Sequence, residues 1–154
     1  MTTQAVSNKP HFFGDAARAQ RPRAVVLVAE DHEDTRLMLR LMLEYRGLGV
    51  VEAGNGAEAV DVAERERPDL VLLDGSLPSL DGFDVTRRIR RSEALSRVPI
   101  VFLSGHAEEA YQDSARDAGC DEFMIKPLDT RQLDRILERH LGAAPVVRGA
   151  RTRA

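Results

Sequence analysis

The chain has 154 residues, of which 43% are hydrophobic and 31% are charged, and its formal net charge is −3. These values are typical of one soluble globular domain, and the small negative charge gives no support for a nucleic-acid-binding protein. No apolar run approaches the roughly 18 residues of a membrane span, residues 1–22 lack the apolar core of a secretory signal, and the single Cys120 leaves no partner for an intrachain disulfide, so we expect a cytoplasmic protein.

Both ends of the chain differ in composition from its middle. Residues 1–22 show no sustained hydrophobic period and contain two prolines, which predicts a flexible leader. Residues 142–154 combine Gly, Pro and three Arg, which is typical of a flexible basic tail. We therefore expect one folded domain over residues 23–141, with no second domain after it.

Short apolar runs alternate with helical patterns along the middle of the chain. Residues 24–29, AVVLVA, form a continuous β-branched run that is typical of a strand buried on both faces, and residues 33–46 follow it with a helical pattern that ends before Gly47. Further strands are predicted at residues 49–53, 69–74, 98–104 and 122–126, and further helices at residues 56–66, 83–92, 107–118 and 129–141. Five strands that alternate with five helices predict a doubly wound α/β fold, with a parallel sheet and right-handed crossovers.

The helix predicted over residues 33–46 carries more apolar residues than one face needs. At about 100° per residue, one arc gathers an expected core face of Leu37, Met38, Leu41, Met42 and Tyr45. Leu39 and Leu43 fall outside that arc. Two interpretations of this pair are open: it packs against the last helix, or it forms an exposed site on which a partner protein docks.

Polar side chains stand at the ends of four predicted strands. Glu30 and Asp31 follow the first strand, and Asp74, Ser104 and Lys126 end the third, fourth and fifth. Ligands of parallel α/β sheets bind at the carboxyl ends of the strands, so we expect these side chains to converge. Crowded carboxylates repel one another unless a cation offsets them, and Mg²⁺ (or Mn²⁺) and a lysine suit this role. The set predicts a site that handles a phosphoryl group, with a carboxylate able to act as nucleophile.

Lysine is rare in this chain. Of its 22 basic residues only Lys9 and Lys126 are lysines, and the others are arginines. A lysine at the end of the fifth strand therefore indicates a position that needs a compact point charge on a flexible stem.

Two other patterns suggest different ligands. Residues 54–59, GNGAEA, fit a dinucleotide-binding fingerprint, but that fingerprint belongs after the first strand of its fold, and a helix cap at Asn55 explains the residues more simply. Residues 86–97, TRRIRRSEALSR, are rich in arginine. Because the whole chain is acidic, we interpret them as a solvated helix face and expect no direct DNA binding.

Four segments resemble, in the same order, the receiver domains of bacterial two-component response regulators: LVAEDHEDTR (27–36), DLVLLDGSLPSLDGFDV (69–85), VFLSGHA (101–107) and FMIKP (123–127). The similarity extends over residues 24–141 and is to the stand-alone, chemotaxis-protein-like type. It implies a flavodoxin-like (βα)5 fold with strand order 2-1-3-4-5.

The resemblance also implies the chemistry of the strand ends. Asp74 would accept a phosphoryl group from a histidine kinase or a phosphotransfer protein. Asp31, Asp74 and the backbone carbonyl of Ser76 would ligate Mg²⁺, and Glu30 would act on the ion mainly through water. Ser104 and Lys126 would bind the phosphoryl oxygens once Asp74 is modified.

Further roles follow from the same resemblance. Phe123 stands where the family couples phosphorylation to a conformational switch, although core packing explains this residue equally well, and Pro127 suggests a cis Lys–Pro bond. Ser76 and His106 occupy positions that tune the lifetime of the phosphoryl group, and we expect a lifetime longer than seconds; His106 is also compatible with an exposed residue at a helix start. Partners of the family approach near the first helix, so the docking interpretation of Leu39 and Leu43 concerns the phosphodonor. The output partner is expected on the face formed by the fourth predicted helix (residues 107–118), the fifth strand (122–126) and the fifth helix (129–141).

Two other functions are alternatives to this one. An aspartyl phosphatase would need a second carboxylate two residues after Asp74, where Ser76 stands, so we expect no enzyme activity beyond self-phosphorylation and self-dephosphorylation. A receiver fold that works as a binding or scaffold module without phosphorylation is the remaining alternative, and the complete set of strand-end residues argues against it.

Overall fold

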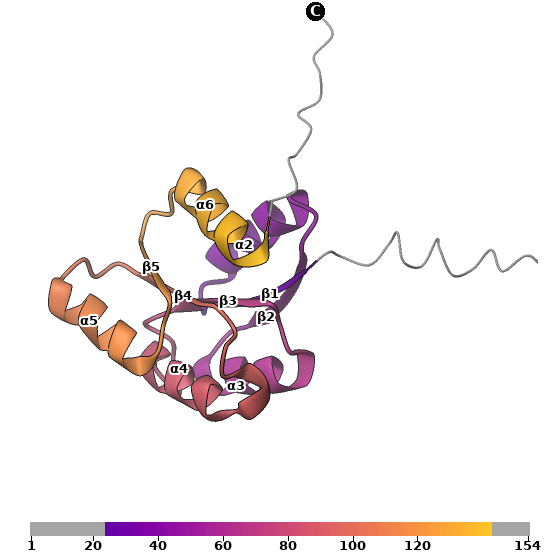
Figure 1. Ribbon diagram of the computed structural model, residues 1–154. Coiled ribbons are helices and arrows are strands. Elements are labelled where there is room, and N and C mark those ends of the chain that lie inside the picture. Colours follow the sequence, from indigo (N-terminus) through magenta and orange to yellow (C-terminus); the bar gives the residue numbers. More distant parts are fainter. Residues whose placement is uncertain (1–23, 143–154) are drawn as a thin grey trace, which may run out of the picture.

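The computed structural model describes residues 24–142 (Figure 1). The predicted leader and, apart from Gly142, the predicted tail lie outside the described residues. The strands are β1 (Val25–Ala29), β2 (Gly49–Ala53), β3 (Leu70–Asp74), β4 (Ile100–Ser104) and β5 (Glu122–Ile125). The helices are α2 (Glu33–Tyr45), α3 (Gly56–Glu66), α4 (Gly82–Arg91), α5 (Glu109–Ala118) and α6 (Thr130–Leu141), with a 3₁₀ turn η1 (Glu93–Leu95). All ten predicted elements are present, with boundaries shifted by at most two residues.

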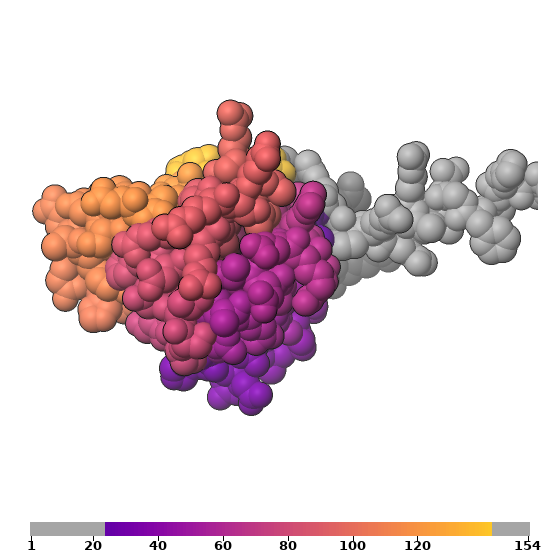
Figure 2. All heavy atoms as spheres, turned by 90° about the horizontal axis from the view of Figure 1, so that it is seen from below, coloured from indigo at the N-terminus to yellow at the C-terminus, as the bar shows by residue number. Residues whose placement is uncertain are grey.

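The five strands form one parallel sheet in the order β2-β1-β3-β4-β5, as predicted. Helices α2 and α6 cover one face of the sheet, and α3, α4 and α5 cover the other (Figure 1). Figure 2 shows the second face, with α3, α4 and α5 side by side and α5 at its edge. Strands β3 and β4 are buried at every residue, because both of their faces lie under helices.

The start of α3 explains the GNGAEA pattern of residues 54–59. The Asn55 side chain accepts a hydrogen bond from the Glu58 N–H at 2.8 Å, which confirms the predicted cap of α3. A Cβ atom on Gly56 would lie 2.0 Å from the Leu80 carbonyl oxygen, so glycine is required where this helix meets the β3–α4 loop. The GNGAEA segment is thus accounted for by a cap and a close contact.

The core face predicted for α2 is wrong. Leu39 and Leu43 are fully buried and pack with Leu133, Ile136 and Leu137 of α6, which confirms the packing interpretation of this pair and contradicts the docking one. Of the predicted core face only Met42 is half-buried, whereas the others are exposed by 43% (Leu37), 46% (Met38), 53% (Leu41) and 69% (Tyr45).

Arginines on the buried side of α2 explain the error. Arg36 and Arg40 extend to β2, where their guanidinium groups lie 3.6 Å and 3.2 Å from the Glu52 carboxylate. Long arginine stems cover apolar surface while their charged ends stay paired. A helical wheel counts these arginines as polar. It therefore places the expected core face on the arc from Leu37 to Tyr45, which holds more apolar residues.

One residue of the arginine-rich segment, Arg90, is held against the protein by hydrogen bonds and is only partly exposed. Arg90 donates hydrogen bonds to the carbonyl oxygens of Gly119 at 2.9 Å and Val98 at 2.6 Å, and to the Asp121 carboxylate at 2.7 Å. It joins α4 to the loops that flank β4 and β5. The neighbouring arginines are exposed, as expected of a solvated face: Arg87, Arg88 and Arg91.

Among the helices of residues 24–142, none combines the length and the apolar character needed to cross a bilayer.

Candidate functional site

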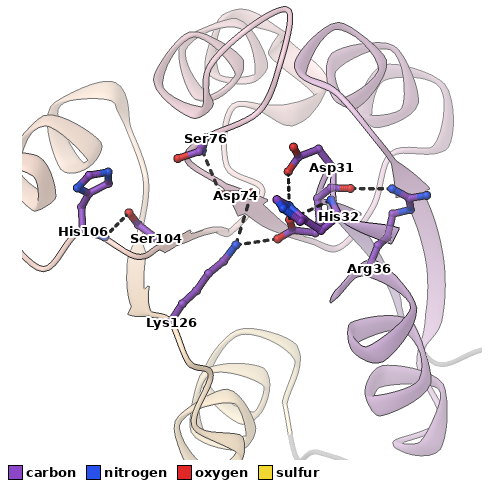
Figure 3. Close-up of polar contacts among 9 residues, drawn as sticks. Asp31, His32, Arg36, Asp74, Ser76, Ser104, His106 and Lys126 are labelled. Atoms are coloured by element: carbon purple, nitrogen blue, oxygen red, sulfur yellow. Dashed lines mark hydrogen bonds and ion pairs between the residues drawn. The ribbon is translucent and has the colours of Figure 1, made fainter. Parts of the chain in front are cut away.

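The predicted strand-end side chains lie at one edge of the sheet (Figure 3). Strand β3 lies between β1 and β4, and β5 follows β4, so the topology makes the four strand ends neighbours. Backbone hydrogen bonds align the ends of β3, β4 and β5. The Gly75 N–H donates to Leu103 O at 2.9 Å, and the Lys126 N–H donates to Ser104 O at 2.8 Å.

A single ammonium group faces two buried carboxylates. Lys126 Nζ lies 2.9 Å from Glu30 Oε2 and 3.5 Å from Asp74 Oδ2. The Glu30 side chain is fully buried and that of Asp74 almost so. Lys126 is therefore held most closely by Glu30, and its distance to Asp74 leaves room for rearrangement.

The charges of this trio do not balance. Burial raises the pKa of Glu30, and the charge of Asp74 adds to this rise, while the hydrogen bond from Lys126 opposes it. Burial alone would lower the pKa of Lys126, but its hydrogen bond to Glu30 and the charge of Asp74 outweigh burial and raise that pKa. Two carboxylates thus share one cation, and the site favours a second positive charge.

Asp31 and His32 form the partly exposed side of the site. His32 Nδ1 lies 3.1 Å from Asp31 Oδ1 and 3.4 Å from Glu30 Oε1. Burial would raise the pKa of Asp31, but the hydrogen bond and charge of His32 outweigh it and lower that pKa. No role for His32 was predicted, although its place directly after the acidic pair was a usable signal.

These residues fit a divalent cation. Glu30, Asp31 and His32 offer ligand atoms that all lie within 4.8 Å of one another. The carboxylate oxygens are the ligands that Mg²⁺ prefers, and the partial exposure of Asp31 leaves space for the waters that this ion keeps. Asp74 does not belong to this compact group in the described part of the chain.

The loop after β3 fixes one oxygen of Asp74. The Ser76 N–H donates to Asp74 Oδ1 at 3.0 Å, while the Ser76 side chain points away (Figure 3). The predicted cis bond between Lys126 and Pro127 is present.

Ser104 is buried at the end of β4, and its hydroxyl oxygen accepts the His106 N–H at 2.9 Å. His106 is exposed and precedes α5, in agreement with its interpretation as an exposed residue at a helix start.

Phe123 is half-buried on β5, and its ring stacks on Phe102 with centroids 5.8 Å apart. Tyr111 of α5 packs beside both rings, at 6.1 Å from Phe102 and 6.3 Å from Phe123, and nothing in the sequence pattern singled it out.

Comparison with known proteins agrees with this geometry. The family model of the response regulator receiver domain matches residues 26–138. The polar-differentiation response regulator DivK of Brucella anthropi is 30% identical over 123 residues, which cover 80% of this chain and 99% of that protein. An uncharacterised 14.6 kDa protein of Leptolyngbya boryana is 35% identical over 120 residues, or 78% of this chain and 92% of that protein.

Solved structures give the same result. The receiver domain of the sensor histidine kinase PA1611 of Pseudomonas aeruginosa PAO1, which has a magnesium ion coordinated in its active-site cleft, is 36% identical with a TM-score of 0.73, covering 78% of this chain and 98% of that one. The chemotaxis protein CheY4 of Vibrio cholerae is 26% identical with a TM-score of 0.72, covering 76% and 98%. With its sheet order and strand-end residues in place, the chain belongs to the receiver domains of two-component response regulators.

Proposed function

We propose that Asp74 accepts a phosphoryl group from a histidine kinase or a phosphotransfer protein, and that the modified domain signals through a protein-binding face. The observation that supports this most is the pairing of Lys126 with both Glu30 and Asp74, beside the partly exposed Asp31. A buried site with two carboxylates and one lysine cation is suited to accept a phosphoryl group together with a metal ion.

In the transfer, an oxygen of the Asp74 carboxylate attacks the phosphorus atom of the donor. The new O–P bond forms as the P–N bond of a phosphohistidine breaks, and its electron pair returns to the imidazole nitrogen of the donor. Lys126 lies 3.5 Å from Asp74 and can move to a phosphoryl oxygen while Glu30 still holds it. The Ser104 hydroxyl accepts the His106 N–H and keeps its own proton to donate to the phosphoryl group.

Asp31, Asp74 and the backbone carbonyl of Ser76 would hold Mg²⁺ (or Mn²⁺), with Glu30 acting through water. The ion supplies positive charge that neutralises the phosphoryl oxygens. His32 bonds Asp31 at 3.1 Å, and so helps to orient a carboxylate of this set.

We also propose that the protein has no hydrolase activity and that it acts in the cytoplasm. Ser76 stands two residues after Asp74, where a hydrolase would place its second carboxylate, so we propose no catalysis beyond self-phosphorylation and self-dephosphorylation. We place the protein in the cytoplasm, where histidine kinases present their phosphorylated residue.

Labelling by a small phosphodonor tests the proposed function. With acetyl phosphate and Mg²⁺, the chain should gain one phosphoryl group that hydroxylamine removes, because an acyl phosphate reacts with this nucleophile. Chelation of the metal by EDTA should reduce the label strongly, since the two carboxylates then face the donor with one cation. Intact-mass spectrometry measures the label. A label that forms equally in EDTA, or that resists hydroxylamine, would contradict the proposal.

Two surfaces are proposed for the partners. The donor docks on the exposed apolar face of α2, defined by Leu37, Met38, Leu41 and Tyr45, because this helix begins two residues after Asp31 and a protein bound there can reach Asp74. The output partner binds the face of α5, β5 and α6, on which Ile125 is an exposed apolar residue (41% exposed).

Lys126→Arg is expected to keep the fold and the affinity for Mg²⁺ but to impair phosphorylation-dependent switching. Arginine preserves the charge beside Glu30, yet its planar fork is larger and cannot move as a point charge between a carboxylate and a phosphoryl oxygen. Backbone NMR shifts measured before and after addition of beryllofluoride, a phosphoryl analogue, report the switch. Shift changes as large as those of the wild type would show that any cation suffices at this position.

A further inference from the structure

Tyr111 of α5 lies at the centre of a cluster of rings behind the phosphoacceptor. Its ring centroid is 4.8 Å from that of His106 and 5.0 Å from that of Phe83. Phe102 and Phe123 complete the group, at 6.1 Å and 6.3 Å. We call these five residues the Tyr111 cluster. It joins α4, β4 and β5 to the loop between β4 and α5.

The Tyr111 hydroxyl lies directly against the residue that follows the phosphoacceptor. A Cβ atom on Gly75 would lie 2.6 Å from the Tyr111 hydroxyl oxygen and 2.5 Å from Phe102 Cε1. No side chain fits between them, so Tyr111 occupies the space beside Gly75. The backbone at Gly75 and the start of α5 are therefore in contact through one side chain.

Tyr111 is also linked to Ser104, through His106. The Ser104 hydroxyl accepts the His106 N–H at 2.9 Å, and the His106 ring packs on the Tyr111 ring. If Ser104 moves toward a phosphoryl oxygen, the backbone of His106 follows it. Tyr111 thus contacts both places that phosphorylation would change, one at Gly75 and one at His106.

Few other side chains hold α5 in place. Its buried residues are only Ala115 and Ala118, and its N-cap Glu108 makes no side-chain cap hydrogen bond. Tyr111 is the one large apolar residue in the helix sequence EAYQDSARDA. Small residues bury little apolar area, so the first half of α5 depends on the Tyr111 ring.

We propose that Tyr111 is a positioning residue that couples Asp74 to α5: a phosphoryl group on Asp74 displaces the Tyr111 ring from beside Gly75, and the start of α5 moves with it. This inference rests on the proposed function of Asp74. It assigns the coupling to a tyrosine on α5, whereas the resemblance had pointed to Phe123 on β5. Phe123 has no hydroxyl, and its ring stacks on Phe102 as a core residue does.

The chain offers a clean optical test, because it has two tyrosines and no tryptophan. In the Tyr45→Phe variant, Tyr111 is the only tyrosine, so its fluorescence reports its surroundings alone. With Mg²⁺ and beryllofluoride, quenching of this fluorescence by acrylamide should increase severalfold as the ring leaves the cluster. The matched control is Tyr111→Phe, in which only the exposed Tyr45 emits and quenching should stay constant.

Fluorine NMR of bound beryllofluoride tests the proposed function of Asp74 separately from the coupling through Tyr111. A bound signal with unchanged Tyr111 quenching would overturn the coupling and leave the proposed function intact. Failure to bind beryllofluoride in the presence of Mg²⁺ would overturn both.

The affinity for beryllofluoride distinguishes coupling from a merely structural role. If the Tyr111 ring must leave before the active arrangement forms, Tyr111→Leu removes part of that cost and should tighten binding severalfold. Phe123→Leu, a substitution of similar size in the same cluster, should leave binding unchanged or weaker. Equal effects of the two variants would contradict the proposal.

Discussion

Asp74→Asn is expected to abolish labelling by acetyl phosphate while making the folded domain more stable. The amide cannot attack phosphorus to form an acyl phosphate. No other carboxylate of the site is contacted by both Lys126 and the Ser76 N–H, so none can take the place of Asp74. The amide oxygen of the substituted side chain can still accept the Ser76 N–H. The loss should therefore be complete within the detection limit of intact-mass spectrometry.

The gain in stability follows from the unbalanced charges. Glu30 and Asp74 share Lys126, and the charge of Asp74 contributes to the raised pKa of Glu30. Removing one of two buried anions leaves a balanced pair, and we expect the free energy of unfolding at neutral pH to increase by about 1 kcal/mol. Urea denaturation followed by circular dichroism measures it.

Asp129→Asn is the matched control, because Asp129 caps α6 outside the site and accepts the Arg131 N–H. This variant should keep the full label. Equal labelling of Asp74→Asn and wild type would overturn the central proposal. A lower stability of Asp74→Asn would show that Asp74 is held by contacts stronger than its repulsion by Glu30.

The fold was predictable from the sequence because its strands are strongly patterned. Runs such as AVVLVA and DLVLLD are continuous and β-branched or leucine-rich, as buried parallel strands require, and Gly or Pro follows three of the four helices between the strands. The convergence of Glu30, Asp74 and Lys126 followed from the topology alone, since parallel strands bring their carboxyl ends to one edge.

The remaining features depend on three-dimensional packing that a one-dimensional pattern does not contain. The orientation of α2 does not follow from its apolar pattern, because Arg36 and Arg40 lie on its inner side and pair with Glu52 of the neighbouring strand. The position of Tyr111 does not follow from the sequence, because its contact with Gly75 joins residues that are far apart in the chain. In both cases a side chain's partner, rather than its own polarity, decides where it lies.

Leu39→Glu and Leu41→Glu, two residues apart on α2, should separate a defect in folding from a defect in docking: the first should unfold the domain, and the second should slow phosphotransfer in a folded one. Leu39 is fully buried against α6, so a glutamate there loses apolar burial and places a charge in the core. We expect a loss of at least about 4 kcal/mol, which is most of the stability of a typical domain. A urea titration followed by circular dichroism should show that this variant is already largely unfolded before urea is added.

Leu41 is 53% exposed on the proposed docking face, so its replacement by glutamate should change the free energy of unfolding by no more than about 0.5 kcal/mol. Labelling by acetyl phosphate should be unchanged, since this donor needs no docking surface. Transfer from a cognate phosphodonor protein should slow markedly, because a charge then faces the apolar surface of the partner. Unchanged transfer in this folded variant would remove α2 from the interface. Because Leu39 and Leu43 are both fully buried, a charge at either position tests folding, and only substitutions on the exposed face of α2 can test docking.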